Sequence, residues 1–487
     1  MRRAAASSAA LLALAVTGLA SAQAPAPARP DRSKPPAAGP VRPLKLPPVQ
    51  QLHLGNGVPV LLLELHEVPV VSANVVVRAG AGADPVDRPG LASLTADMLD
   101  EGAGSASALQ ISDELDYLGA DLQARAGWDD TSVSLHVPVK RFAAALPIFA
   151  DVVLRPTFPE AELERVRKDR LTELLQLRDE PRAIASIAFA NALYGRRHRY
   201  GTPTIGTEAS VRRFSRADLT GFHARAFRPA NAAIVVVGDV TAASLLPQLE
   251  QAFGGWKAAP GEPPSAVPAA PQVRERGVWI VDRPGSAQSE IRIGRIGPPR
   301  TTPDYFALTV MNTILGGSFT SRLMQNLREQ HGYAYGARSF FDYRLSTGPF
   351  TATAAVQTDK TAPALAEFFK ELDAIRKNVT EAEVAKAKNY IALSFPSEVE
   401  TTGDIASKLE DQFVYGLPAG WLDSYVANIS AVTLADVKRV AEQYVDPAKV
   451  AVVVVGDRKK IESEVRALNL GPVRFQTLPD LFGARPR

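Results

Sequence analysis

The segment PANAAIVVVGD at residues 229–239 recurs 218 residues later as PAKVAVVVVGD at residues 447–457. Each copy joins a Pro-led turn to an apolar, β-branched run, which is typical of a turn followed by a buried strand. Asp218 and Asp436 each stand 21 residues before the last Asp of a copy, so a preceding helix is repeated as well. A third match, EAEL at 160–163 and EAEV at 381–384, starts a further pair of helices. The sequence therefore predicts two copies of one folding unit, with 234–237 and 452–455 in equivalent buried strands.

The two predicted units are homologous α+β domains at residues 49–257 and 273–475, each expected to carry a mixed or antiparallel sheet with helices packed on it. In the first unit, apolar runs at 58–63 and 70–77 predict strands. Helical spacing covers 89–101, 109–118, 141–153 and 160–178, and the alternating segment 121–137 predicts a hairpin. Residues 258–272 hold five prolines and little apolar bulk, which indicates a linker between the units.

The N-terminal region has the three parts of a secretory signal peptide at residues 1–22, with two arginines, an apolar run and small residues at the cleavage site. A short membrane anchor is the alternative, but the run is shorter than the roughly 20 residues that cross a bilayer. Residues 23–48, rich in Pro and Ala, predict a flexible leader, and 476–487 a C-terminal tail. We expect an exported protein, periplasmic or otherwise, without a transmembrane segment after signal removal.

The composition is that of a globular chain, since 46% of the 487 residues are hydrophobic and 22% are charged. Loss of Arg2 and Arg3 with the signal peptide lowers the formal charge from +3 to +1, so nucleic acid is not an expected partner. The chain has no Cys, which excludes disulfides, thiolate metal ligands and thiol catalysis. No nucleophile elbow, phosphate loop or dinucleotide fingerprint occurs in a fitting context.

The stretch GGSFTSRLMQNLREQHGYAY at residues 316–335 carries the candidate binding residues. Leu323 and Leu327 have helical spacing and Gly332 is a helix stop, so Arg328 is expected in a last helical turn and Tyr335 on a following strand. A guanidinium fork and a phenol together can hold a peptide carbonyl or a developing oxyanion. From spacing alone, the alternative is a surface Arg and a half-buried Tyr that cover apolar surface.

This stretch resembles the C-terminal-domain signature of the insulinase, or pitrilysin, family of zinc metallopeptidases, which runs Gly-Gly, Ser-Arg-Leu, Leu-Arg-Glu, Gly and Ala-Tyr. The resemblance extends from about Val49 to Gly471. It implies two similar halves joined by a linker, closing like a clamshell around a peptide. It also implies that Arg328 and Tyr335 are the family's substrate-binding pair. Arg322, nearby on the same helix, is expected to anchor that helix.

The family's active members carry His-x-x-Glu-His on the helix that corresponds to residues 90–102, where two imidazoles bind zinc and the Glu activates water. Alignment on GLA at 90–92 places Ser93 and Asp97 at the two His positions and Ala96 at the Glu position. The third ligand, a Glu on a later helix, corresponds to Glu173, although a strict count reaches Leu174. A solvated glutamate is the alternative for Glu173. We expect a degenerate motif that holds no metal and performs no catalysis alone.

Other metal sites find little support in the sequence. No two of the six histidines are three or four residues apart, which excludes a helical pair, although ligands gathered by folding stay open. Asp97, Asp100 and Glu101 form a small acidic cluster, for which a solvated helix face is the preferred interpretation over a site for a hard cation.

Some bacterial members of the family resemble the two-subunit mitochondrial processing peptidase, in which one subunit carries the zinc motif and the other supplies the Arg/Tyr pair. The resemblance therefore implies an exported, zinc-less subunit that completes a peptide-binding chamber with a paralogous zinc-binding partner. One alternative is a structural or peptide-binding protein with no peptidase partner. A second alternative is an independent hydrolase with an unrecognised site.

Overall fold

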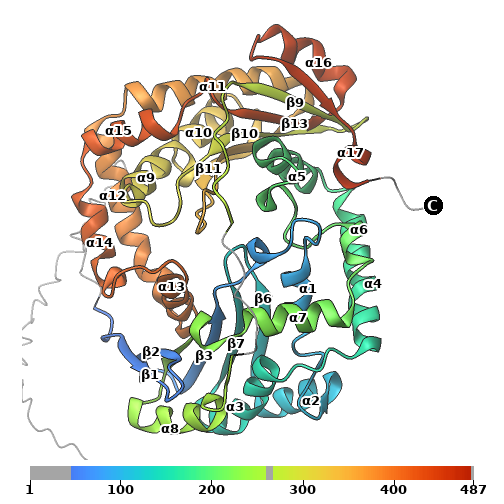
Figure 1. The fold of residues 1–487 in the computed structure, drawn as a ribbon. Coiled ribbons are helices and arrows are strands. Elements are labelled where there is room, and N and C mark those ends of the chain that lie inside the picture. The colour runs from blue at the N-terminus through green and yellow to red at the C-terminus, as the bar shows by residue number, and fades with distance from the viewer. Residues whose placement is uncertain (1–44, 259–266, 484–487) are drawn as a thin grey trace, which may run out of the picture. The chain divides into compact units, whose positions relative to one another are not determined.

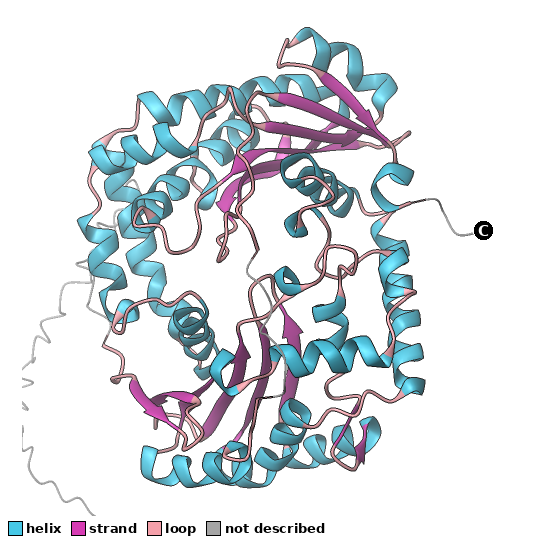
Figure 2. Ribbon diagram, viewed as in Figure 1, coloured by secondary structure: helices cyan, strands magenta, loops and turns pink. Residues whose placement is uncertain are grey.

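The computed structural model describes residues 45–258 and 267–483. The predicted signal peptide, most of the predicted leader and part of the linker lie outside these ranges. The described residues belong to one compact unit with two six-stranded sheets, each covered by helices (Figures 1 and 2). This is the α+β class that the sequence predicts.

The two sheets are built from twelve strands. In spatial order, the first sheet contains β1 (Gln50–His53), β2 (Pro59–Glu64), β8 (Ala232–Gly238), β3 (Val70–Val77), β7 (Thr131–Pro138) and β6 (Asp121–Ala126). The second contains β11 (Ala334–Phe341), β12 (Pro349–Gln357), β10 (Gln288–Ile296), β13 (Ala451–Gly456), β9 (Gly277–Asp282) and β14 (Val473–Gln476). A separate small ladder joins β4 (Gly102–Ala103) to β5 (Ala106–Ser107).

The second sheet, taken in reverse order, repeats the first. β8 lies parallel to β2 and antiparallel to β3, and β13 lies parallel to β9 and antiparallel to β10. β8 and β13 are buried along their whole length. The prediction that 234–237 and 452–455 occupy equivalent buried strands is confirmed. The two sheets differ at one edge strand: β1 pairs antiparallel with β2, whereas β14 pairs parallel with β9.

The helices follow the same repeat. The first half carries α1 (Leu91–Asp97), α2 (Ala108–Leu118), α3 (Val139–Leu154), α4 (Glu160–Leu177), α5 (Pro181–Tyr194), α6 (Glu208–Val211), α7 (Arg216–Ala226) and α8 (Ala242–Phe253). The second carries α9 (Tyr305–Asn312), α10 (Arg322–Met324), α11 (Thr361–Lys377), α12 (Glu381–Ser394), α13 (Thr402–Val414), α14 (Trp421–Ala431), α15 (Leu434–Tyr444), α16 (Arg458–Ala467) and α17 (Leu478–Phe482).

α1 is shorter than the predicted helix over 89–101. Gly90 adopts a left-handed φ of 94°, so the helix begins only after it. After Asp97 the chain turns toward the small ladder of β4 and β5, while Met98 and Leu99 still enter the core. A run of apolar residues can therefore be buried without being helical.

The two halves exchange one helix each. α5 belongs to the first half but packs on β10 and β13, and α13 belongs to the second half but packs on β3 and β8 (Figure 1). The two helices are equivalent, because Ile-Ala-Ser at 184–186 and Tyr-Gly at 194–195 recur 221 residues later at 405–407 and 415–416. Each sheet is thus completed by a helix from the other half, which explains why the described chain is one unit.

A third contact between the halves lies at the loop between β11 and β12. The guanidinium carbon of Arg344 is 4.1 Å from the ring centre of Trp128 and 4.3 Å from that of Tyr200, both of the first half. The backbone N–H of Leu345 donates to Asp129 Oδ2 at 2.8 Å.

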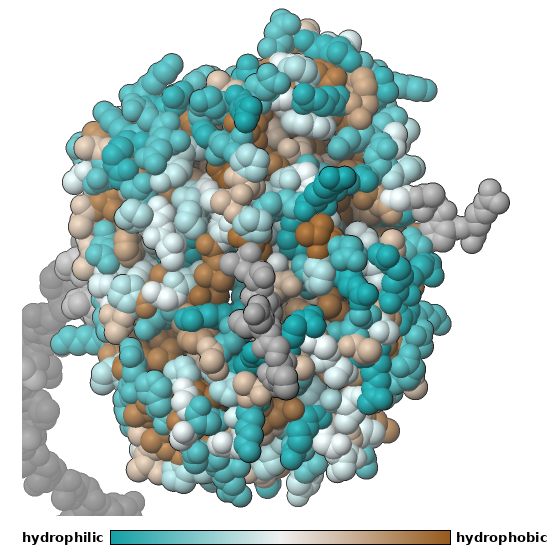
Figure 3. All heavy atoms as spheres, viewed as in Figure 1, coloured by the Kyte–Doolittle hydropathy of each residue, from teal (hydrophilic) through white to brown (hydrophobic). Residues whose placement is uncertain are grey.

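In the described ranges, no helix has the length and apolar character needed to cross a bilayer. The face in Figure 3 mixes hydrophilic and hydrophobic side chains.

Candidate functional site

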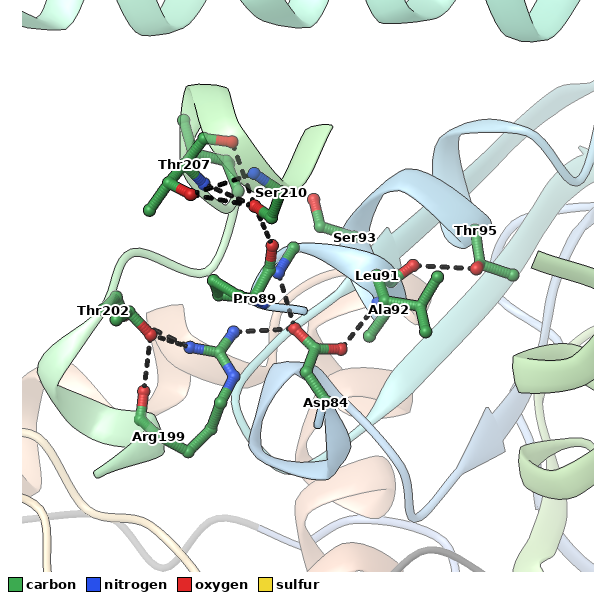
Figure 4. A network of polar contacts seen from close by, with 12 residues as sticks. Asp84, Pro89, Leu91, Ala92, Ser93, Thr95, Arg199, Thr202, Thr207 and Ser210 are labelled. Carbon is green, nitrogen blue, oxygen red and sulfur yellow. Dashed lines mark hydrogen bonds and ion pairs between the residues drawn. The ribbon is translucent and has the colours of Figure 1, made fainter. Parts of the chain in front are cut away.

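The position of α1 is fixed by a buried carboxyl group. Asp84 accepts hydrogen bonds from the backbone N–H groups of Gly90 (2.7 Å) and Ala92 (2.8 Å) and from Arg199 Nη2 (2.7 Å) (Figure 4). Burial raises the pKa of Asp84, and the charge of Arg199 opposes that rise. Ser210 Oγ also donates to Pro89 O at 2.7 Å. These contacts hold the start of the degenerate motif helix against the loop and helix that flank it.

An arginine stands among the degenerate motif positions. Arg170, on α4, is only 6% exposed, and its Nη2 donates to Ser93 Oγ at 3.2 Å and to a carboxyl oxygen of Asp97. Its Nε lies 3.1 Å from Glu173 Oε2. Burial raises the pKa of Asp97, and the charge of Arg170 opposes that rise. One guanidinium therefore joins the three side chains that the family resemblance predicts at the metal-ligand positions.

These residues do not fit zinc. Ser93 is a weak neutral ligand, Ala96 offers a methyl group, and the positive charge of Arg170 opposes a cation among the same oxygens. In the described part of the chain, no three His, Cys, Asp or Glu side chains gather as a metal site. Glu173, and not Leu174, faces this cluster, because Leu174 is buried in the core of the first half.

The acidic cluster is not the solvated helix face that the sequence suggested. Asp97 pairs with Arg170, and Glu101 pairs with Arg165. Burial raises the pKa of Asp100. Glu173 is solvated, with its side chain 51% exposed, and it also contacts Arg170. Sequence reasoning missed Arg170, and the available signal was its place one helical turn before Glu173.

Arg328 and Tyr335 are brought together as the sequence predicts. Arg328 lies in the π-helical turn η5 (Gln325–Gln330), and Tyr335 lies on β11, after Gly332 with its left-handed φ of 64°. The guanidinium carbon is 5.1 Å from the Tyr335 ring centre and 4.8 Å from that of Phe319. The side chain of Arg328 is 30% exposed, and Tyr335 is 86% exposed. The pair is thus assembled and accessible to a ligand.

Phe319 was given no role from the sequence, yet it completes this group. It is 59% exposed, and the guanidinium carbon of Arg328 lies near its ring centre as well as that of Tyr335. A large apolar residue in the otherwise small and polar run from 316 to 321 was the available signal. Exposed aromatic surface beside a cation is suited to holding a peptide side chain.

Arg322 anchors the same segment to Glu383 and Asn378, as expected. Its Nε and Nη2 donate to the two carboxylate oxygens of Glu383 at 2.7 and 2.9 Å, and its Nη1 donates to Asn378 Oδ1 at 2.9 Å. Such a two-point contact fixes the orientation of the guanidinium as well as its position. It ties α10 to the start of α12.

The fold and the 316–335 signature define a homologue of a two-domain metallopeptidase. Residues 60–208 match the description "Insulinase (Peptidase family M16)", and residues 213–391 match "Peptidase M16 inactive domain". The chain therefore belongs to the insulinase family, peptidase family M16, as a member that lacks His-x-x-Glu-His.

Similar proteins share most of their length with this chain. An uncharacterized zinc protease of Mycobacterium bovis is 27% identical over 425 residues, covering 85% of this chain and 95% of that protein. The crystal structure of a peptidase M16 inactive domain from Pseudomonas fluorescens, 27% identical, has a TM-score of 0.78 and covers 84% of this chain and 98% of that one. A protease from Helicobacter pylori, with 22% identity and a TM-score of 0.79, covers 84% and 100% and shares the fold.

Proposed function

We propose that this chain is an exported, zinc-less subunit of a heteromeric insulinase-family peptidase, inactive alone. It supplies Arg328 and Tyr335 to the substrate site formed with a paralogous partner that carries the zinc. The observation that carries the proposal is the contrast between the two sites: Arg170 occupies the degenerate metal position, whereas Tyr335 is exposed and Arg328 beside it is partly exposed.

The chemistry of the pair supports a role in substrate binding. Charge-assisted hydrogen bonds from a guanidinium strengthen as an attacked carbonyl becomes an oxyanion, so the pair favours the transition state more than the bound peptide. Loss of the pair should therefore lower turnover more than folding or pairing.

The first experiment identifies the partner and then tests the pair. A tagged chain is recovered from an extract of its own cells, and an exported paralogue with His-x-x-Glu-His is the expected companion. With that companion, Arg328→Ala or Tyr335→Phe should each cost about 2–4 kcal/mol in turnover of a cleaved peptide, by analogy with removal of one oxyanion donor. Arg322→Ala is the matched control, because its ion pair anchors the helix and its loss should lower stability more than rate. Unchanged cleavage by the Arg328→Ala and Tyr335→Phe complexes would remove the main support for the proposal.

The second experiment concerns metal. The isolated chain should purify without stoichiometric zinc and should show no chelator-sensitive peptidase activity. Ser93→His, Ala96→Glu and Asp97→His restore the motif, but Arg170 should still block the site. Zinc binding is therefore expected only when Arg170→Leu is added to these three changes, with Glu173 as the remaining ligand. One tightly held zinc per wild-type chain would contradict this interpretation.

The alternatives make different predictions in the same experiments. A structural or peptide-binding protein would be recovered without a peptidase partner. An independent hydrolase would cleave peptides alone, and its activity would survive Arg328→Ala.

A further inference from the structure

A cavity of about 480 Å³ lies between α5 and the second sheet and is lined by both halves. Much of its wall is apolar and includes the side chains of Leu177, Ile187, Phe189, Leu193 and Phe340. Its carboxylates are already paired, because Glu173 contacts Arg170 and Asp342 contacts Arg344. A pocket of this size is large enough for a small organic ligand.

One cation in the wall has no such partner. Arg292, on β10, is 9% exposed, and its Nε is buried without a hydrogen-bond partner among the described residues. Its Nη2 donates a long hydrogen bond to Arg182 O at 3.4 Å, and Arg292 forms no direct ion pair with a described side chain. Burial lowers the pKa of Arg292 to about 10. Glu290, two residues before Arg292 on β10, opposes that fall through its charge but forms no direct ion pair with it. A buried guanidinium without a direct partner is costly.

The internal repeat identifies the residue of the first half that is equivalent to Arg292. Asn74 pairs with Val235 in the first sheet as Arg292 pairs with Val453 in the second, so the two residues are equivalent. Asn74 Nδ2 donates to Glu410 Oε1 of the crossing helix α13 at 2.5 Å. The equivalent residue on α5, at the same 221-residue offset, is Phe189. In the first half, α13 therefore places the carboxyl group of Glu410 against Asn74. In the second half, α5 carries the phenyl ring of Phe189 at the equivalent position.

We infer that this cavity binds a carboxylate carried by an apolar group, with the guanidinium of Arg292 as its counter-charge. Two sources have this chemistry, a peptide with an apolar C-terminal residue and a fatty acid. Glu290 offsets part of the positive charge of Arg292, whereas Arg182 and Arg338 add positive charge nearby. The inference does not depend on a partner subunit.

Calorimetry on the purified full chain tests the inference with defined probes. The probes are N-acetyl-Phe-Leu with a free carboxylate, the same dipeptide as its amide, and decanoate. At least one acid should bind, and the amide should bind at least about tenfold more weakly than its acid, because it cannot form the charge-assisted pair. Binding by the dipeptide alone indicates a peptide C-terminus, and binding by decanoate alone indicates a lipid acid.

Two variants locate the counter-charge. Arg292→Met should weaken acid binding by about tenfold or more. Arg295→Met is the matched control, because Arg295 is equally buried on the same strand but faces away from the cavity, toward Asp446. Phe189→Glu supplies from α5 the carboxyl group that Glu410 supplies from α13, and it should abolish acid binding with Arg292 intact.

The comparison of acid with amide on the wild-type chain holds even if a variant fails to fold. No binding of either acid up to about 10 mM, equal binding of acid and amide, or unchanged binding by Arg292→Met would overturn the inference.

Discussion

The two exchanged helices occupy the same place in the repeat but contact their sheets through different chemistry. α5 meets the second sheet with apolar side chains alone in its core cluster, among them Ile184, Ala188 and Phe189 against Val453 and Val455. The fit is close at Gly294, where a Cβ atom would lie 2.9 Å from Phe189 Cζ. Shape complementarity is therefore the main stabilising feature of this contact.

α13 meets the first sheet with a mixed surface. Ile405, Ala406 and Leu409 enter the core, while Thr402 Oγ1 lies 2.8 Å from Ser72 Oγ. The carboxyl group of Glu410, only 4% exposed, also accepts hydrogen bonds from Ser132 Oγ (2.9 Å) and Arg125 Nη2 (3.1 Å).

This difference shows that one fold position can be stabilised in two ways. An apolar contact depends on volume and area, whereas a buried polar contact depends on every donor keeping its acceptor. The second sheet combines an apolar helix with Arg292, and both line the cavity between the halves. Four sets of substitutions test this difference between the α5 and α13 contacts.

The largest effect is expected for Phe189→Ala. Removal of a buried ring that packs on Gly294 leaves a cavity that the rigid sheet cannot close, so the free energy of unfolding should fall by about 3–5 kcal/mol. Denaturant unfolding measures this loss. Phe189→Leu is the control and should cost clearly less, since it keeps most of the volume. A loss below about 1 kcal/mol for Phe189→Ala would show that the contact is loosely packed.

Glu410→Ala should come next. It leaves Asn74 and Ser132 as buried donors without an acceptor, at an expected cost of about 2–3 kcal/mol in unfolding free energy. Glu410→Gln keeps an acceptor oxygen and should cost less than half as much. If the two variants are equally stable, hydrogen bonding to Glu410 contributes little to the exchange of helices.

Asp130 gives the α13 contact a pH dependence. Burial, reinforced by the charge of Glu410, raises the pKa of Asp130 from its ordinary value of 3.8 to about 7. The folded state then binds more protons than the unfolded state between these two values, so this group's contribution to stability falls as pH rises from about 4 to about 7 and is level above that.

Asp130→Asn should remove this penalty and raise the unfolding free energy by on the order of 2 kcal/mol at pH 8, with no gain near pH 4. Thermal unfolding of both proteins across that pH range measures the difference. Charged neighbours that share the site are Arg125, Asp129, Glu410 and Asp411. An equal gain at every pH would mean that the effect is not one of ionisation.

The smallest effect is expected for Ser72→Ala. It removes the buried hydrogen bond to Thr402 and should cost about 1 kcal/mol in unfolding free energy. Ser72 Oγ also lies 3.0 Å from His136 Nδ1, so Thr402→Val alone leaves it one partner. The double variant with Thr402→Val should cost less than the sum of the two single changes, because the hydrogen bond that both changes remove is then lost only once. Simple additivity would show that the two hydroxyls act independently.

Much of the fold could be predicted from local patterns. The repeated turn and strand, with its 218-residue offset, depends only on neighbouring residues in the chain, and so does the helix stop at Gly332 that separates Arg328 from Tyr335. Apolar periodicity marks buried faces because hydrophobic burial acts on each element as it packs. The loss of the metal motif at Ser93, Ala96 and Asp97 is likewise visible in the sequence itself.

Other features were decided only by the tertiary structure. The sequence analysis assigned no helix to the residues of α5, and apolar periodicity there could not have shown which sheet buries the helix, because periodicity does not identify a packing partner. Arg170 enters the degenerate site, and Arg292 lines a cavity without a direct ion pair to a described side chain, because distant strands and helices bring these residues to their neighbours. Ion pairs, burial and pKa values depend on distances in space, and residues far apart in sequence set those distances only when the chain has folded.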